Sequence, residues 1–180
     1  MSNQGPLTGM KVIELAHIMA GPACGMMLAD MGADVIKVEK PDGDDSRRFL
    51  PPDIKGESAA YMMMNRNKRG IALNLKDPDA IEALRGLLKD ADVVIENYRH
   101  DTMQKLGLGY EDLRKINPKL VYCAVSGFGR TGPYAERGGF DLIAQGMSGL
   151  MSITGEGPGR PPVKPGAPIA DITAGFLAAL

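Results

Sequence analysis

The sequence predicts an α/β protein with an open, mainly parallel, Rossmann-like sheet and helices on both faces. Three observations support this prediction. Short segments rich in branched apolar residues alternate with helical patterns, about four times along the chain. Turn residues separate the two kinds of segment. The 180 residues are enough for one domain with a substantial core.

The first strand, helix and strand define one βαβ unit. Residues 11–16 read as a buried strand, and Gly21 and Pro22 mark a turn into a helix over residues 23–32. Residues 33–41 then form a second strand, which Pro41 ends. Because the crossover is a helix, we expect a parallel pair with a right-handed connection.

The later elements follow the same alternation. A long polar loop over 41–58 precedes the methionine triplet at 62–64, which we interpret as core filler. Asp77 is the expected N-cap, and Pro78 the first residue, of a well-signalled helix. The remaining expected elements are a basic turn at 65–70, strands at 71–75, 92–97 and 119–129, helices at 110–117 and 140–151, and an apolar helix from 172.

Composition disfavours several classes of function. The net charge of -1 gives no reason to expect nucleic acid or an anionic membrane as partner. No apolar run approaches the roughly 18–20 residues that span a bilayer, and the start of the chain lacks a signal-peptide pattern. Cys24 and Cys123 form no CxxC motif, so we predict buried, reduced thiols in a cytoplasmic protein. His17 and His100 lie far apart in sequence, and we predict no metal site.

The familiar nucleotide and hydrolase motifs are missing. Glu39 ends the second strand, where a dinucleotide-binding protein carries an acid, but Gly21 and Gly25 do not make a G-x-G-x-x-G turn. Pro22 also stands where the backbone would approach a pyrophosphate. Glu39 is then explained by pairing with Lys40 or a nearby arginine. A phosphate-binding G-x-x-x-x-G-K-[ST] loop and a G-x-S-x-G nucleophile elbow are both absent from the sequence.

Basic residues follow several predicted strands. Lys40, Lys76 and Arg99 each come after a strand, and ligands of open α/β sheets bind at the carboxyl ends of the strands. These side chains could hold the phosphates of a nucleotide. A solvated basic surface explains the same pattern.

Asp171 is an isolated acid in the stretch "GAPIADITAG", before an apolar helical run. One interpretation is helix capping, a common role of Asp in this position. The other is catalysis, since the N–H groups and dipole at a helix start favour an ionised carboxylate, which can attack an acyl carbon. Spacing alone leaves both open.

Long blocks of the chain resemble the class III CoA-transferases, the group of formyl-CoA transferase and carnitine CoA-transferase. These blocks are "LTGMKVIELAHIMAGPACGMMLADMGADVIKVEKP", "NRNKRGIALNLK", "DVVIENYR", "LGLGYEDLRKINPKLVYCAVSGFGRTGPY" and "GFDLIAQGMSG". They cover nearly the whole chain, in order and with the family's spacing.

The resemblance implies a nucleophile and a set of contacts to coenzyme A. Asp171 in "ADITAG" matches the family's nucleophile, which passes through an aspartyl anhydride and an aspartyl-CoA thioester. Backbone N–H groups are expected to stabilise the oxyanions. By position, the residues expected to contact coenzyme A, the substrate and carrier, are Met19, Ala20, Lys40, Leu73, Asn74, Lys76, Asn97, Tyr98, Arg99, Lys105 and Arg137.

One block separates transferases from their racemase relatives. The α-methylacyl-CoA racemases resemble this chain, but their block reads G-H-D, with His as acid and base, whereas here it reads "GFD". Phe140 cannot carry a proton, which favours a transferase. A racemase-like isomerase and a non-catalytic CoA-binding fragment are the alternatives.

Family members are roughly twice as long as this chain. The resemblance therefore implies that residues 1–180 are the N-terminal part of the large domain, without the small domain and the C-terminal return. It also implies an interlocked homodimer, with acyl-CoA and a carboxylic acid as substrates.

Overall fold

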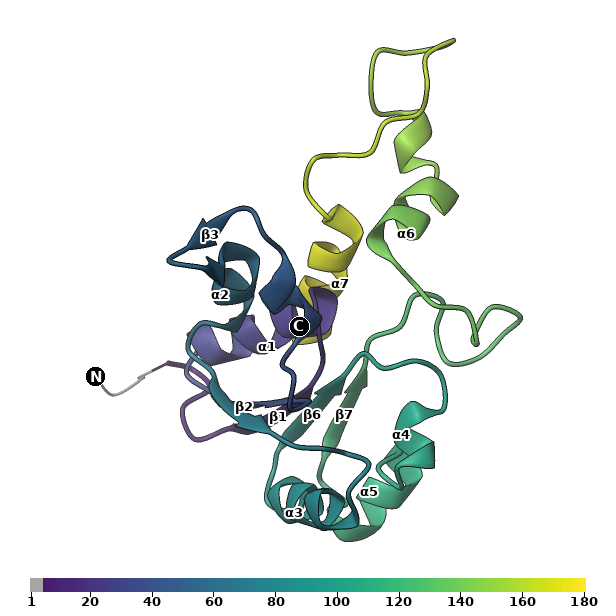
Figure 1. The fold of residues 1–180 in the computed structure, drawn as a ribbon. Helices are drawn as coiled ribbons and strands as arrows, with labels where there is room; N and C mark the ends of the chain where they lie inside the picture. Colours follow the sequence, from purple (N-terminus) through teal and green to yellow (C-terminus); the bar gives the residue numbers. More distant parts are fainter. Residues whose placement is uncertain (1–4) are drawn as a thin grey trace.

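A computed structural model describes residues 5–180 and confirms the predicted fold class (Figure 1). The main sheet has the order β5-β2-β1-β6-β7, and every neighbouring pair is parallel. This is the strand order of a doubly wound sheet, which reverses between β1 and β6. The strands are β1 (Lys11–Leu15), β2 (Asp34–Glu39), β5 (Arg69–Ala72), β6 (Val93–Glu96) and β7 (Val121–Ala124).

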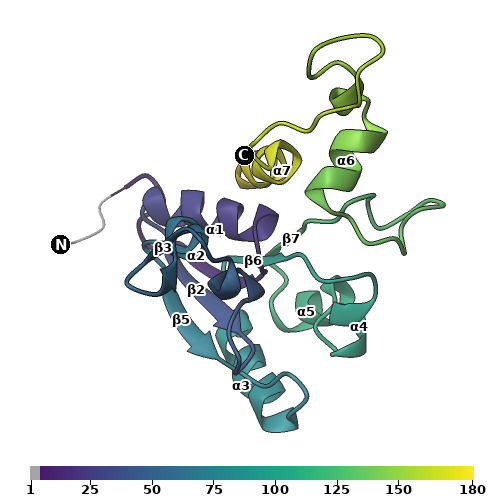
Figure 2. The same ribbon diagram turned by 45° about the horizontal axis from the view of Figure 1, so that its top comes forward.

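Helices cover both faces of this sheet (Figures 1 and 2). One face carries α1 (Ala20–Asp30) and α7 (Ile169–Ala179), which lie against each other. The other face carries α3 (Pro78–Lys89), α4 (Thr102–Lys105) and α5 (Tyr110–Ile116). The remaining elements are α2 (Ala59–Asn65), α6 (Asp141–Met147), the 3-10 turns η1 (Asp45–Arg48) and η2 (Leu150–Ser152), and the hairpin of β3 (Asp53–Ile54) with β4 (Glu57–Ser58).

Alternate residues of each strand build two separate cores. Val12 packs with α1 residues, whereas Ile13 packs with Leu84 and Leu88 of α3 on the opposite face. Successive side chains of a strand point to opposite faces, so both faces are apolar where a helix covers each of them. Because both faces of these strands are buried, the strands appear in the sequence as uninterrupted runs of apolar residues.

The α1 and α7 helices touch at a glycine. A Cβ at Gly175 would lie 2.6 Å from the Cβ of Ala23 and 2.8 Å from the carbonyl oxygen of Ala20. Only a residue without a side chain permits this approach of the two backbones. Gly175 thereby fixes the place of α7, and with it of Asp171, against the helix that follows β1.

The structure corrects several sequence predictions in detail. Helix α1 begins at Ala20, so Gly21 and Pro22 lie in its first turn and not in a preceding turn; proline is tolerated there because N–H groups of the first turn lack helical partners. Strand β5 begins at Arg69, inside the predicted turn. Helices α2 and α4 were not predicted, because they are short and lack a clear apolar period.

The methionine triplet and the cysteines are less buried than predicted. Met64 is buried, but Met62 and Met63 are 44% and 51% exposed, because they lie on the outer side of α2. Cys24 and Cys123 are free thiols, as predicted, yet only Cys24 is buried.

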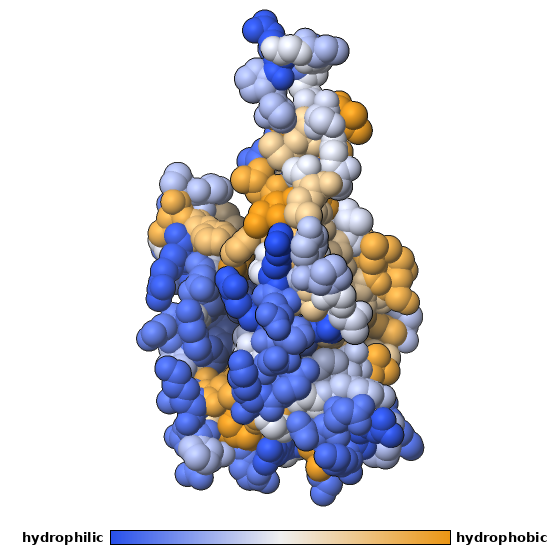
Figure 3. All heavy atoms as spheres, turned by 90° about the vertical axis from the view of Figure 1, so that its right-hand side faces the viewer, coloured by the Kyte–Doolittle hydropathy of each residue, from blue (hydrophilic) through white to orange (hydrophobic). Residues whose placement is uncertain are grey.

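Helix α6 and the segment after it extend away from the sheet (Figures 1 and 2). Figure 3, which views the right-hand side of Figure 1, shows apolar atoms below a mostly hydrophilic tip and above a largely hydrophilic lower part. The exposed apolar side chains of α6 and its continuation are Leu142, Ile143, Met147 and Ile153. In residues 5–180, no helix is long and apolar enough to cross a membrane. The signal-peptide prediction falls partly on residues 1–4, outside the described residues.

Candidate active site at the switch point of the sheet

A pocket of about 460 Å³ opens at the carboxyl ends of β1, β6 and β7. Its walls are the loop 17–20, the loop 97–100, the segments 125–130 and 135–140, and the start of α7. Strand order reverses between β1 and β6, so the loops after these strands diverge and leave a crevice there. The pocket is therefore at the position where open α/β sheets bind ligands.

The loop from β1 to α1 is held in an unusual conformation. Ile18 has a φ of +66°, a left-handed value that a branched side chain rarely adopts. Both carboxylate oxygens of Asp44 accept a hydrogen bond from the N–H of Ile18, at 3.1 and 3.2 Å. Asp44 is 4% exposed and also accepts from the backbone N–H and hydroxyl of Ser46. The surrounding contacts thus fix the strained loop at the mouth of the pocket.

Asn97 holds the same loop from the other side. Its Oδ1 accepts from the N–H of His17 at 2.9 Å, and its Nδ2 donates to the carbonyl of His17 at 2.8 Å. The rings of His17 and Tyr98 lie 5.6 Å apart. Burial lowers the pKa of His17, against the opposing field of Asp44, so its imidazole is neutral at pH 7.

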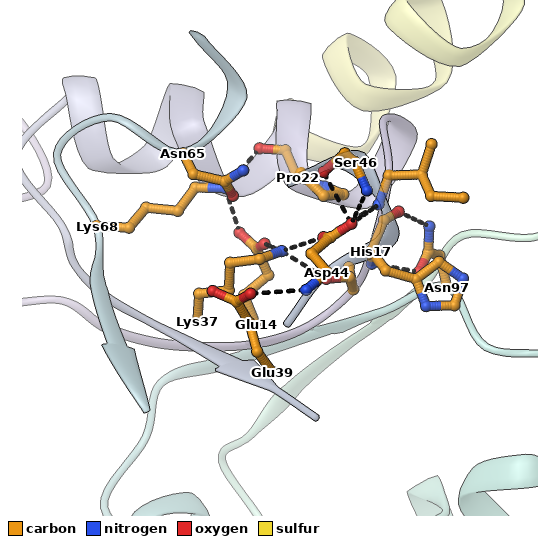
Figure 4. Close-up of polar contacts among 12 residues, drawn as sticks. Glu14, His17, Pro22, Lys37, Glu39, Asp44, Ser46, Asn65, Lys68 and Asn97 are labelled. Atoms are coloured by element: carbon orange, nitrogen blue, oxygen red, sulfur yellow. Dashed lines mark hydrogen bonds and ion pairs between the residues drawn. The ribbon is translucent and has the colours of Figure 1, made fainter. Parts of the chain in front are cut away.

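A buried network of four charged side chains lies beneath α1 (Figure 4). Lys37 Nζ is 3.0 Å from Glu14 Oε1 and 3.0 Å from Asp44 Oδ2, and it donates to the carbonyl of Ala16 at 2.8 Å. Lys68 Nζ is 2.7 Å from Glu14 Oε2. The facing carboxylates raise the pKa of Lys37 despite its burial. Asp44 is therefore a fixed anchor, ion-paired through the network to the centre of the sheet.

Sequence reasoning missed this network, although a signal for it was present. Glu14 and Lys37 occupy core positions of buried strands, on the face that packs against α1. A buried charge at such a position requires a partner of opposite charge. Glu14 and Lys37 therefore each indicate that an oppositely charged side chain lies nearby.

Asp171 lies half-buried in the pocket wall, in the first turn of α7. The capping interpretation is wrong, because α7 begins at Ile169 and its N-cap position is Pro168. The carboxylate of Asp141 accepts instead from the N–H groups of Ala170 and Asp171. Burial, followed by the neighbouring charge of Asp141, raises the pKa of Asp171.

Arginine side chains line the pocket together with Asp171. Arg130 forms an ion pair with Glu96, whose pKa is raised by burial even though Arg130 opposes the shift. The guanidinium of Arg99 packs against Gly138, where a Cβ would lie 3.2 Å from its Nη1. Arg137 stacks on the Tyr134 ring, 4.1 Å from its centre. The pocket thus combines one acid with cationic groups that suit anionic ligands.

The predicted site residues fall into two groups. Those in the pocket wall are Met19, Ala20, Asn97, Tyr98, Arg99, Arg137 and Asp171. Those outside this wall are Lys40, Leu73, Asn74, Lys76 and Lys105. Lys40 pairs with Asp45 at 2.6 Å on the surface, and the Leu73 N–H donates to the Glu39 carbonyl at the edge of the sheet. Contact of either group with coenzyme A stays a prediction.

The structure confirms that Glu39 is paired within the protein, through the arginine of the two partners considered. Both of its carboxylate oxygens are 2.8 Å from Arg47 nitrogens, and the Tyr61 hydroxyl donates to Oε1 at 2.7 Å. These partners lower the pKa of Glu39 to about 2 although burial opposes the shift. Its partner is therefore an arginine and not Lys40, and its carboxylate is occupied by the protein itself.

The fold and pocket define a doubly wound α/β protein with an acid nucleophile candidate at the switch point. The model of the family "CoA-transferase family III" matches residues 7–180, and the chain belongs to this family.

Relatives and solved structures agree with this assignment. The chain is 55% identical over 178 residues to a succinate–glutarate CoA-transferase of Agrobacterium fabrum, covering 95% of this chain and 44% of the relative. It is 45% identical to the human succinyl-CoA:glutarate CoA-transferase, covering 99% and 41%. The crystal structure of a CAIB/BAIF family protein from Brucella suis superposes with a TM-score of 0.93 at 50% identity, covering 97% and 47%. The chain thus spans less than half the length of these proteins.

Proposed function

We propose that the protein carrying this chain transfers CoA from an acyl-CoA thioester to a free carboxylic acid, with Asp171 as nucleophile. The observation that carries this proposal is the place of Asp171, in a pocket wall at the switch point of the sheet. Membership of the family and the names of the relatives support it.

The chemistry follows from an ionised carboxylate beside a bound thioester. An Asp171 oxygen attacks the acyl carbon, the C–S bond breaks, and a mixed anhydride and the CoA thiolate result. The thiolate attacks the aspartyl carbonyl and expels the donor acid as its carboxylate, which leaves an aspartyl-CoA thioester. The acceptor carboxylate attacks that thioester and expels the thiolate again. The thiolate then takes the new acyl group from the anhydride and restores Asp171.

Each addition places negative charge on a carbonyl oxygen, which needs donors. The N–H groups of Ala170 and Asp171 already bind Asp141, so they are occupied in this arrangement. Met19 and Ala20 at the start of α1 line the pocket, as do Gly138 and Gly139, which have no side chain. We propose that oxyanion donors come from these segments and not from α7.

We propose a short dicarboxylic acid, such as succinate or glutarate, as the substrate class. Relatives at 45–55% identity are named for the transfer of CoA between these acids. The pocket that contains Asp171 also contains Arg99, Arg130 and Arg137. A guanidinium can bind the second carboxylate of such a substrate in a forked pair, as well as a phosphate of CoA.

To test the proposal, the native-length protein is incubated with succinyl-CoA and glutarate, and the CoA products are separated by chromatography. Wild type is expected to form glutaryl-CoA, and Asp171→Asn to lose at least about a thousandfold in kcat. The matched control is Asp79→Asn, which changes a first-turn aspartate of α3 outside the pocket wall. Full activity of Asp171→Asn contradicts the proposal. Proton exchange at C2 of a 2-methylacyl-CoA in deuterated water, without transfer, favours the racemase-like alternative.

The assembly and compartment of the protein also belong to this proposal. The interlocked homodimer stays a prediction from the resemblance, supported by the exposed apolar side chains of α6 and its continuation. Light scattering of the native-length protein tests it, and a monomer contradicts it. A cytoplasmic location stays a prediction from the sequence.

A further inference from the structure

Asp141 caps a helix to which it does not belong. It is the first residue of α6, yet its Oδ1 accepts from the Ala170 N–H at 2.8 Å and from the Asp171 N–H at 3.3 Å. The N-cap residue of α7, Pro168, makes no side-chain cap bond. The first turn of α7 is thus anchored by a carboxylate from a separate element.

Gln145 fixes the other oxygen of this carboxylate. It lies one turn after Asp141 on α6, is 1% exposed, and donates from Nε2 to Asp141 Oδ2 at 2.5 Å. Only the amide nitrogen can donate to a carboxylate, so the contact defines which way the amide points. Its Oε1 is buried and has no hydrogen-bond partner among residues 5–180. The Asp141 carboxylate is therefore held on both sides.

We propose that Asp141, oriented by Gln145, is a positioning residue for Asp171. This inference rests on the proposed function of Asp171 as nucleophile. The capping bonds fix the backbone of the nucleophile, and so the direction from which its carboxylate meets the thioester. The charge of Asp141 has a second effect on the same group.

That second effect is on the basicity of the nucleophile. Asp141 is a like charge beside Asp171 and contributes to its raised pKa, after burial. Other titratable and charged groups of the pocket wall are His17, Tyr98, Arg99, His100, Arg130 and Arg137. Since Asp171 must be ionised to attack, activity falls as pH drops through its pKa. Removal of the Asp141 charge lowers that pKa and moves this fall to lower pH.

Two substitutions at position 141 separate the cap from the charge. In Asp141→Asn the amide oxygen can still accept both N–H groups, and Gln145 can turn over so that its unpartnered Oε1 accepts from the new amide nitrogen. This variant keeps the cap and loses the charge. Asp141→Ala loses both. Asp79→Ala, in the first turn of α3, is the matched control.

The measurements are hydrogen exchange of the first turn of α7 and the pH profile of kcat in the native-length protein. Asp141→Ala is expected to speed exchange of this turn and to lower kcat at least about tenfold, with KM for acyl-CoA within about twofold. Asp141→Asn is expected to keep wild-type exchange, recover most of kcat, and move the acid limb of the profile to lower pH.

Three results overturn the inference. The first is faster exchange in Asp141→Ala with unchanged kcat, which leaves the cap structural only. The second is an Asp141→Asn variant as impaired as Asp141→Ala, and the third is an acid limb that does not move. If the wild-type protein does not transfer CoA, the proposed function is also wrong. If the wild-type protein is active, any of the three results above overturns only the role of Asp141.

Discussion

The buried network beneath α1 predicts that the same substitution, lysine to methionine, changes the stability of the fold very differently at positions 37 and 40. Lys37 and Lys40 both pair with an aspartate, Lys37 within the core and Lys40 on the surface. We expect Lys37→Met to destabilise the fold strongly and Lys40→Met to leave its stability almost unchanged. Methionine retains most of the apolar stem, so the substitutions mainly remove the charge.

The magnitudes follow from what each lysine leaves behind. Without Lys37, the Asp44 carboxylate loses its cation while its side chain is 1% exposed, and the carbonyl of Ala16 loses a donor. Breaking a buried pair from one side costs about 3–5 kcal/mol. The Lys40–Asp45 pair has both side chains about half exposed, and such pairs contribute about 0–1 kcal/mol.

Urea unfolding of the native-length protein, followed by far-UV circular dichroism, measures both variants. With a slope of about 2 kcal/mol per M, the midpoint of Lys37→Met is expected to lie roughly 2 M below wild type. Coincident transitions by circular dichroism and tyrosine fluorescence check that a single transition is observed. A Lys37→Met midpoint no lower than that of Lys40→Met refutes the reasoning.

Three further predictions concern the neighbourhood of the pocket. Gly175→Ala places a Cβ 2.6 Å from the Cβ of Ala23 and should cost about 1–3 kcal/mol in the free energy of unfolding. Gly86→Ala in α3, where a Cβ would meet nothing within 4 Å, should cost nothing, and equal unfolding midpoints of the two variants contradict this. Asn97→Ala frees the backbone of His17, and we expect KM for acyl-CoA to rise about tenfold, with faster hydrogen exchange at 17–19; unchanged values contradict it. A hydrogen bond from Cys24 lowers the pKa of Cys123 to about 7, so the alkylation rate of Cys123 should rise as pH passes 7. In Cys24→Ala this rise should move to higher pH. The same pH profile of alkylation in both proteins contradicts the prediction.

The regular elements were predictable because local patterns determine them. Strands buried on both faces are continuous apolar runs, and α3 carries its own Asp77 cap and Pro78 start. The short helix α2 and the start of α1 were missed, since their boundaries depend on packing and not on a local stop signal.

Of the candidate site, the local sequence patterns predicted only the residues that come directly after the ends of strands. Residues after β1 and β6 meet at the pocket because parallel strands end at one edge of the sheet. The capping of α7 by Asp141 was not predictable, because it joins side chain and backbone across a sequence separation of 30 residues. The anchor from Asp44 to Ile18 spans 26 residues and depends on the same kind of tertiary contact.

Trapping the acylated aspartate tests the central claim most directly. The native-length protein is mixed with acyl-CoA, quenched and reduced with borohydride, which converts an aspartyl anhydride or thioester to homoserine and leaves free carboxylates intact. Peptide mapping by mass spectrometry is predicted to find homoserine at position 171, dependent on acyl-CoA. Turnover with Asp171 unmodified, or homoserine at another position such as 141, contradicts the account.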